Sequence, residues 1–216
     1  MNNDYRQWIQ TALDNAGPLP IPTKHVEQVT MPDGTLEFKQ RYGVGQRMLL
    51  ALLIVFGLVF VVTGFVLATR NVWAGIAVLA FSVPLLLGII WAFVRIGKSY
   101  VLETRDFIEV QMYRKAVRIY FADVVKGYPW YWKGNRYILL MDHSGARVQV
   151  DTSAFQAPLT VRVAAVVLAY ETKPHRMEKM IKNVEFMGKQ TFPSDFVQYL
   201  YHINAQAQAA NGNALQ

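Results

Sequence analysis

Two long apolar runs near the middle of the chain constrain its fold more than any other feature. Between Arg47 and Arg95 the only charged residue is Arg70, and the flanking runs, residues 48–69 and 71–94, hold 22 and 24 residues. Each run meets the requirement of about 20 apolar residues for a helix that crosses a bilayer. A chain of 216 residues is too small to bury two helices that are apolar all round. We therefore expect a two-helix transmembrane hairpin over residues 47–95.

The distribution of basic side chains predicts the orientation of this hairpin. Six of them flank the two runs on the side away from the connecting loop: Lys39, Arg41, Arg47, Arg95, Lys98 and Arg105. The loop itself offers Arg70 alone. Because Lys and Arg are retained on the cytoplasmic side, we expect a multi-pass protein with both termini in the cytoplasm.

Small residues along the two runs indicate close helix packing. They are Gly57, Gly64, Ala68, Gly88 and Ala92. Two pairs of them have the small-xxx-small spacing that lets helices approach closely. They either pack the two helices of one hairpin together or contact another molecule. Neither run contains an ionisable residue, so the usual marker of an ion path or proton relay is missing.

The first 46 residues predict a cytoplasmic helix and a β-hairpin. Residues 3–16 read as a helix with Trp8, Ile9 and Leu13 on one face, which lies either on the membrane surface or on the C-terminal domain. PLPIP, residues 18–22, predicts a stiff linker. Two strand-like segments then flank a Pro-Asp-Gly turn at residues 32–34. Such a hairpin is marginal alone, so we expect it to dock on the sheet of the C-terminal domain.

Beyond the second run the pattern changes to a period of two, which is typical of half-buried strands. Six short strands are predicted, within residues 99–104, 108–112, 117–121, 128–132, 137–141 and 146–151. A helix beginning near Pro158 follows, with Leu159, Val163, Val166 and Tyr170 on one face. Residues 98–171 therefore predict a small barrel or sandwich plugged by a helix. Residues 172–216 predict a basic connector, a short helix and a disordered tail.

These segments resemble a known family. Two apolar runs followed by YVLETRDFIEVQ, AVRIYFADVVKGYPWYW and YILLMDHSGARVQVD look like the bacterial pleckstrin-homology-like (PH-like) domain proteins, over residues 48–171. The resemblance implies an α+β membrane protein, in which a transmembrane hairpin precedes a small antiparallel PH-like β-barrel closed by a C-terminal helix. It also implies a non-enzymatic module in the bacterial inner (cytoplasmic) membrane. The basic cluster of phosphoinositide-binding relatives is absent, because only Lys98 and Arg105 lie near the first strands.

One segment mixes aromatic and basic residues, and it is the main candidate for a contact with a partner or with the membrane. The candidate residues are Tyr128, Trp130, Trp132, Lys133 and Arg136. Aromatic rings beside cations suit protein interfaces and headgroup layers. The alternative is that Tyr128, Trp130 and Trp132 simply pack inside the domain.

A second candidate surface would bind anionic lipid. Residues 95–216 hold sixteen basic and ten acidic side chains, and a positive segment tethered to a bilayer is attracted to anionic headgroups. The candidate residues are Lys98, Arg114, Lys115 and Arg118. The basic residues are scattered rather than gathered into a stripe, so nucleic acid is not an expected partner.

Catalytic chemistry is not indicated. The chain has no cysteine, and its histidines, at positions 25, 143, 175 and 202, lack the spacing of metal ligands. Asp142, His143 and Ser144 are adjacent, whereas a catalytic triad needs residues from separate elements. We expect no cofactor and a non-enzymatic interaction or assembly module that binds the bilayer and a protein partner or a second copy. The alternative is a subunit of a membrane enzyme or transport complex with its site at the cytoplasmic face.

Overall fold

A computed structural model describes residues 3–17, 26–32, 36–112 and 115–213. The chain divides into two compact units. The hairpin unit comprises residues 41–100 and 112–114, and the domain unit comprises residues 1–40, 101–111 and 115–216. The domain unit is thus discontinuous in sequence, because the hairpin unit interrupts it.

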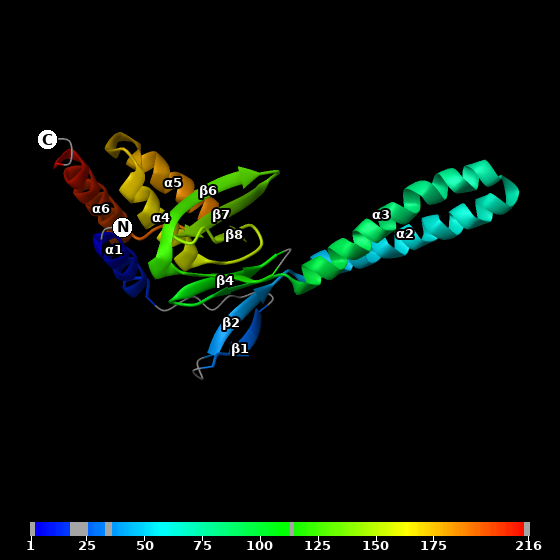
Figure 1. The fold of residues 1–216 in the computed structure, drawn as a ribbon, viewed down its shortest axis with the longest axis horizontal. Helices are drawn as coiled ribbons and strands as arrows, with labels where there is room; N and C mark the ends of the chain where they lie inside the picture. Colours follow the sequence, from blue (N-terminus) through cyan, green and yellow to red (C-terminus); the bar gives the residue numbers. More distant parts are fainter. Residues whose placement is uncertain (1–2, 18–25, 33–35, 113–114, 214–216) are drawn as a thin grey trace. The chain divides into compact units, whose positions relative to one another are not determined.

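The hairpin unit contains two long apolar helices, α2 (Val44–Arg70) and α3 (Val72–Lys98), which run side by side (Figure 1). Asn71 joins them, and its side chain accepts a hydrogen bond from the Ala74 N–H at the start of α3 (3.2 Å). Only 6% and 11% of the most apolar stretches of α2 and α3 are buried. Both helices are long and apolar enough to cross a membrane, and they are not the buried core helices of the fold.

The domain unit is built on two antiparallel sheets (Figure 1). The first has the order β1 (Val26–Thr30), β2 (Leu36–Arg41), β3 (Tyr100–Glu103), β4 (Phe107–Gln111), β5 (Val117–Tyr120). The second has the order β6 (Val124–Trp132), β7 (Asn135–Asp142), β8 (Arg147–Asp151). A 3-10 turn, η1 (Phe121–Asp123), links the two sheets.

The N-terminal hairpin docks on the domain as expected, because β2 pairs with β3. Its turn at Asp33 and Gly34 lies outside the described residues. The Gln40 side chain fastens the hairpin further, since its Oε1 accepts from the Gln156 N–H (2.7 Å) and its Nε2 donates to the Gln156 carbonyl. The N-terminal segment is therefore an integral part of the domain unit.

The fold is α+β with antiparallel sheets, but within the described residues the two sheets do not close into a barrel. The N-terminal hairpin occupies the outer edge of β3, so that edge is not available to a strand of the second sheet. The expected barrel is thus replaced by two separate sheets.

Helix α4 (Pro158–Glu171) forms the centre of the domain core. It contacts β6, β7 and three further helices, namely α1 (Asn3–Asp14), α5 (Met177–Gly188) and α6 (Ser194–Asn213). Leu159, Val163 and Val166 are buried as predicted, but Val161 and Val167 on other sides of the helix are buried too. A helix covered on every side is apolar all round, which explains why α4 lacks a polar face.

The structure differs from the connector and disordered tail expected after residue 171. A short 3-10 turn, η2 (Pro174–Arg176), leads into α5, which buries Met177, Ile181 and Val184. Helix α6 extends to Asn213 and buries Ile203 and Ala207. These residues recur at helical spacing and cover α4, so the segment is folded by packing despite its polar composition.

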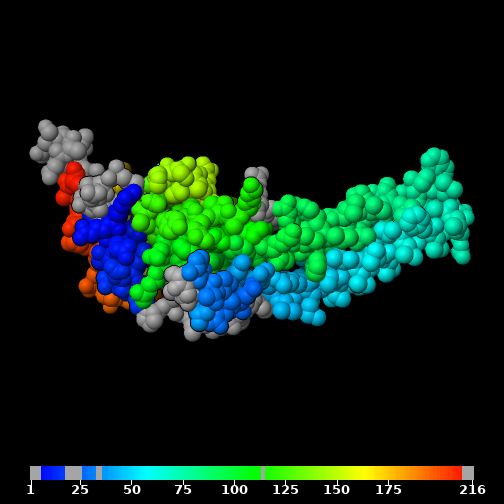
Figure 2. All heavy atoms as spheres, turned by 60° about the horizontal axis from the view of Figure 1, so that its bottom comes forward, coloured from blue at the N-terminus to red at the C-terminus, as the bar shows by residue number. Residues whose placement is uncertain are grey.

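Helix α1 lies on the domain, which decides between the two positions considered for it. Ile9, Ala12 and Leu13 are buried, and the Trp8 ring lies 5.7 Å from that of Tyr170 on α4. The Tyr199 hydroxyl of α6 donates to the Trp8 carbonyl (2.9 Å). Figure 2 shows α1 in dark blue beside the red α6. The predicted linker at residues 18–22 lies outside the described residues.

Side chains from other elements cap both ends of α4. At its start, the Glu103 carboxylate accepts hydrogen bonds from the Leu159 N–H (3.2 Å), the Thr160 N–H (2.7 Å) and the Thr160 hydroxyl (2.6 Å). At its end, Asn204 Nδ2 donates to the Ala169 and Thr172 carbonyls (2.7 and 2.6 Å). These bonds satisfy backbone groups that a helix leaves unpaired at its termini.

Candidate functional site

The aromatic-basic segment forms a tight two-stranded ribbon at the end of β6 and the start of β7. Trp130 lies opposite Tyr137, and Trp132 lies opposite Asn135. Lys133 and Gly134 make the turn with φ of 48° and 84°. Two consecutive left-handed residues are typical of the type I′ turn, whose twist matches that of the strands. The turn therefore sets a register that aligns the aromatic rings.

Strand alternation gathers Tyr128, Trp130 and Trp132 on one side of the ribbon, and we call these three residues the aromatic face. Tyr128 is 41% exposed and Trp132 is 51% exposed. Trp130 is half-buried, stacks on Tyr137 with 5.0 Å between ring centroids, and lies 6.4 Å from Trp132. The outer two rings of the face are thus open to solvent, while the central one is fixed by its neighbours.

The indole of Trp130 carries an unsatisfied donor. Its Nε1 atom is buried and has no hydrogen-bond partner. A buried N–H without an acceptor costs about 1–3 kcal/mol, and buried indoles usually find a partner. Within the described part of the chain, the Trp130 indole N–H is therefore buried and unpaired.

The two basic residues of the segment lie in different environments. Lys133 Nζ lies 4.6 Å from the centre of the Trp132 ring, so this cation borders the aromatic face. Arg136 pairs with Tyr131, whose side chain points to the opposite side of the ribbon. Its guanidinium stacks 3.9 Å over Phe186 and donates to the Phe186 carbonyl (2.9 Å). Arg136 thus fastens the ribbon to α5.

The proposed lipid-binding residues are distributed over both units. Arg118 donates to the Glu109 carboxylate through Nε and Nη2 (3.0 and 2.8 Å), and these hydrogen bonds raise its pKa above the usual value. Its charge is therefore offset by Glu109. Lys115 is exposed in the domain unit and Lys98 is exposed at the end of α3, whereas Arg114 lies outside the described residues.

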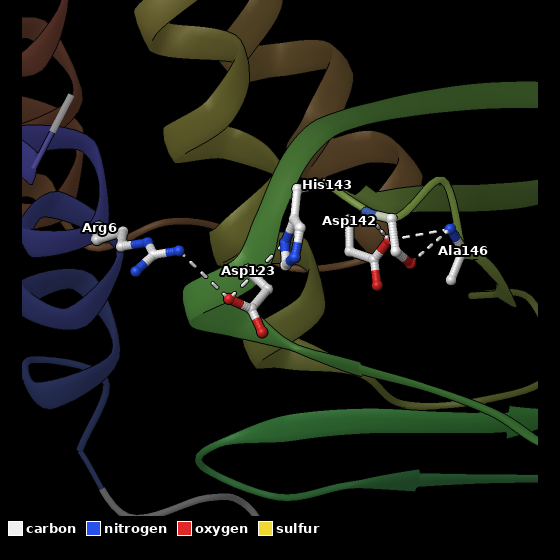
Figure 3. A network of polar contacts seen from close by, with 6 residues as sticks. Arg6, Asp123, Asp142, His143 and Ala146 are labelled. Carbon is white, nitrogen blue, oxygen red and sulfur yellow. Dashed lines mark hydrogen bonds and ion pairs between the residues drawn. The ribbon is translucent and has the colours of Figure 1, made fainter. Parts of the chain in front are cut away.

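The adjacent Asp142, His143 and Ser144 form a structural turn (Figure 3). Asp142 Oδ1 accepts from the N–H and hydroxyl of Ser144 (2.9 and 2.7 Å) and from the Ala146 N–H (2.9 Å). Desolvation opposes ionisation of Asp142, but these hydrogen bonds outweigh it and hold its pKa below the usual value. The Ser144 hydroxyl thus donates to Asp142, an arrangement that fixes a turn and does not activate a nucleophile.

Asp123 lies between two basic groups from different elements (Figure 3). Its carboxylate lies 3.5 Å from Arg6 Nη2 of α1 and 3.9 Å from His143 Nδ1. Both contacts are partly exposed, so they contribute little to the stability with which α1 and the β7–β8 turn are held in place. Among the described residues there is no group of three or more His, Cys, Asp or Glu that could hold a metal ion.

Most of the small residues predicted to pack the apolar helices lie between α2 and α3. A Cβ at Gly57 would lie 2.9 Å from Leu86 Cδ1, and one at Gly64 would lie 2.9 Å from Leu79 Cδ2. Ala68 is similarly close to Gly75. By contrast, a Cβ at Gly88 would meet nothing within 4 Å, and Ala92 is half-buried. Gly57, Gly64 and Ala68 therefore pack the hairpin itself, while Gly88 faces outward.

No protein-family model, curated protein or solved structure matches the chain. What the chain does must therefore follow from its own geometry, and the aromatic face is the feature with the clearest chemistry. Sequence reasoning did not include Tyr137 in this site, although a two-residue turn at Lys133-Gly134 places it directly opposite Trp130.

Proposed function

We propose that this protein is a membrane-anchored interaction module whose aromatic face binds a protein partner. The observation that carries the proposal is the row of Tyr128, Trp130 and Trp132 on a rigid ribbon, with two exposed rings. Trp and Tyr are enriched among the residues that dominate protein interfaces. A partner that covers the exposed rings of Tyr128 and Trp132 would remove this apolar surface from water.

The membrane anchor in this proposal is the α2–α3 hairpin, in a bacterial inner membrane with both termini cytoplasmic. The exposure of its apolar side chains supports a lipid environment. The discontinuous domain unit adds a second argument. Segments before and after the hairpin fold together, which supports a topology with both ends of the hairpin on the same side of a bilayer. This agrees with the positions of the flanking basic residues.

The relationship to bacterial PH-like domains is part of the same proposal. Strands β3–β5, strands β6–β8 and α4 follow in the order expected for such a domain. In this interpretation the chain has two kinds of addition to such a domain. The β1–β2 hairpin extends the first sheet, and helices α1, α5 and α6 cover α4. The proposed role is assembly or scaffolding, with no catalytic step.

Site-specific photo-crosslinking in intact membranes tests the partner. A photoreactive phenylalanine analogue replaces Trp132 in one variant and Tyr131 in the control. These side chains are similarly exposed (51% and 56%) but lie on opposite sides of the ribbon. We expect a discrete protein adduct of one mass from position 132 and none from position 131. Adding Tyr128→Ala, which removes an exposed ring of the same face, should weaken the adduct strongly, because such anchors contribute about 2 kcal/mol or more.

Two results would contradict the proposal. Adducts to phospholipid alone at position 132 would make the aromatic face a membrane contact. Equal protein adducts at positions 131 and 132 would show that the ribbon has no preferred binding side.

A further inference from the structure

A hollow of about 360 Å³ lies in the domain unit, where the start of β7 meets the end of α5 (Figure 1). Four charged residues line it, namely Arg136 on β7, Lys182 and Glu185 on α5, and Lys189 directly after α5. Cations therefore outnumber carboxylates by three to one among the described residues that line the hollow. Like charges gathered around one hollow repel each other, so an anion that enters the hollow relieves this repulsion.

Arg136 and Lys189 are held at the hollow by carbonyl groups. Arg136 Nη1 donates to the Phe186 carbonyl (2.9 Å), and its guanidinium stacks over the ring of the same residue. Lys189 has a φ of 52°, and its Nζ donates to the Ser153 carbonyl (2.9 Å). A guanidinium has five N–H donors and an ammonium has three, so one bond leaves several donors in each group. Because a carbonyl carries no net charge, these bonds position the two cations without neutralising them.

Lys182 is the third cation, and its present partner holds it only weakly. Its Nζ lies 2.5 Å from Glu178 Oε1, but the two side chains are 71% and 73% exposed. Such an ion pair contributes little in water, so Lys182 is able to turn toward a ligand. The carboxylate of Glu185 lines the hollow, but its Oε1 accepts from the Phe192 N–H (2.7 Å) and is thus directed toward the backbone after α5.

Two features oppose an anion at this place, and both are offset. The first is the end of α5, because the C-terminus of a helix carries partial negative charge. The last carbonyls, of Glu185 and Phe186, accept from the N–H groups of Gln190 and Lys189 (3.2 and 3.4 Å). The second feature is Asp151, whose charge interacts with that of Lys189. Asp151 is only 7% exposed and does not line the hollow, so it does not meet the ligand.

We propose that this hollow binds a phosphate monoester group through Arg136, Lys182 and Lys189. Three cations and one carboxylate leave an excess of two positive charges, and a phosphate monoester carries a charge of about −1.5 to −2 at neutral pH. A guanidinium binds two phosphate oxygens with its planar fork, while ammonium groups act as point charges. The phosphodiesters of nucleic acid fit less well, since each carries one charge and they are spaced along a chain.

The hollow is open to solvent, so the rest of the ligand extends away from the protein. The phosphate group therefore belongs either to a soluble molecule or to a lipid headgroup. This inference goes beyond the proposed function and does not use the aromatic face, because Arg136 lies on the other side of the ribbon. Loss of the protein adduct at position 132 and loss of phosphate binding are thus separate results.

Isothermal titration calorimetry of the full chain in a mild, uncharged detergent tests the site. Glycerol phosphate is the soluble probe, and phosphatidic acid in detergent micelles presents the same group as a lipid. Glycerol and phosphatidylcholine are the matched compounds without a phosphate monoester. We expect saturable binding at one site per chain that weakens as the salt concentration rises. Binding of glycerol phosphate supports a soluble ligand, and binding of phosphatidic acid alone supports a headgroup. Saturable binding of neither probe would overturn the proposal.

Three substitutions test the residues that we assign to the site. Lys182→Gln changes an exposed side chain, and Lys189→Asn introduces a residue that tolerates positive φ. Each should weaken binding about tenfold, the effect of one hydrogen bond to a charged group. Lys179→Gln is the control, because it removes the same charge from an exposed position on α5 that does not line the hollow. It should weaken binding less than about twofold. Equal losses in Lys179→Gln and Lys182→Gln would show a general attraction to positive charge and would contradict a site at the hollow.

Discussion

Glu103 belongs to β3 and completes the first turn of α4. It is buried, and this burial raises its pKa to about 7, even though hydrogen bonds from Thr160 and Leu159 favour the ionised form. The folded protein therefore binds this proton more tightly than the unfolded chain, in which the pKa is about 4.5. The stabilising contribution of Glu103 is complete below about pH 4.5 and is lost as the pH rises through about 7.

We expect the free energy of unfolding to fall by roughly 3 kcal/mol between these pH values because of Glu103. Glu103→Gln should remove this pH dependence. Urea unfolding of the full chain in mild detergent, followed by tryptophan fluorescence at several pH values, measures it. Glu171→Gln, at the exposed end of α4, is the matched control and should keep the wild-type slope. An unchanged slope in Glu103→Gln would assign the pH dependence to other groups.

Asn204 has the corresponding role at the end of α4. Asn204→Ala keeps a good helix former in α6 but leaves the Ala169 and Thr172 carbonyls without this donor. We expect a loss of about 1–3 kcal/mol in the free energy of unfolding, measured by the same urea titration. Gln206→Ala, at an exposed position on α6, should change stability by less than about 0.5 kcal/mol. Similar losses in both variants would point to a general effect on α6.

Neither cap was predictable from the sequence. Glu103 is separated from Thr160 by 57 positions and Asn204 from Ala169 by 35, and no local pattern links residues so far apart. The aromatic face was predictable in part, since alternation alone places Tyr128, Trp130 and Trp132 on one side. Arg136 lies on the other side of the ribbon because it pairs with Tyr131, and its contact with Phe186 was not predictable because the sequence did not predict α5.

At the scale of elements, the strands and the short C-terminal helix followed from local patterns, whereas α5 and the extension of α6 to Asn213 did not. Alternating apolar residues in β4, β5 and β8 have a period of two, which marks strands directly. The first half of α6 buries Phe196, Leu200 and Ile203 at helical spacing, whereas the second half buries Asn204 and Ala207, a polar and a small residue that carry little apolar signal. Its helical state depends on packing against α4, and such tertiary effects override a weak local pattern.

Close packing of α5 on α4 gives a prediction for Gly188. A Cβ at this position would lie 2.5 Å from Val161 Cγ1, and Val161 is almost fully buried. Gly188→Ala should therefore lower the free energy of unfolding by about 1–3 kcal/mol, the usual cost of overpacking a core. Thermal unfolding followed by circular dichroism checks this.

The control for this substitution is Gly97→Ala near the end of α3, where a Cβ would meet nothing within 4 Å. That variant should be neutral or slightly stabilising, because alanine favours a helix more than glycine does. A neutral Gly188→Ala would mean that α5 can shift away from α4 without loss.

At the scale of the whole molecule, the prediction concerns topology. In spheroplasts a membrane-impermeant maleimide should label Asn71→Cys, in the connection between α2 and α3, directly from outside. It should label Ser144→Cys, in the exposed β7–β8 turn, only after permeabilisation. The reverse pattern would invert the orientation, and direct labelling of both thiols would contradict a pair of membrane spans.

The apolar helices were predictable because composition alone defines them, and docking of the β1–β2 hairpin on the C-terminal sheet was predicted because such a hairpin is marginal alone, whereas the position of α1 was left between two alternatives. Chain order suggested a separate N-terminal region of 46 residues, but α1 and the β1–β2 hairpin belong to the domain unit. The buried contacts of Ile9 and Gln40 with this unit carry no signal in their own neighbourhood.

Because the hairpin interrupts the domain in sequence, its translation delays the completion of the domain. A ribosome adds about 5–20 residues per second, so the 60 residues from Arg41 to Tyr100 delay the arrival of β3 by roughly 3–12 s after β2 is made. The apolar helices α2 and α3 are therefore made before β3 and α4, the elements on which the β1–β2 hairpin and α1 pack. Asn204 is translated later than nearly every other residue, so α4 lacks its final cap until synthesis is almost over. With the membrane span that we propose, both apolar helices are complete and can insert before the domain can close around α4.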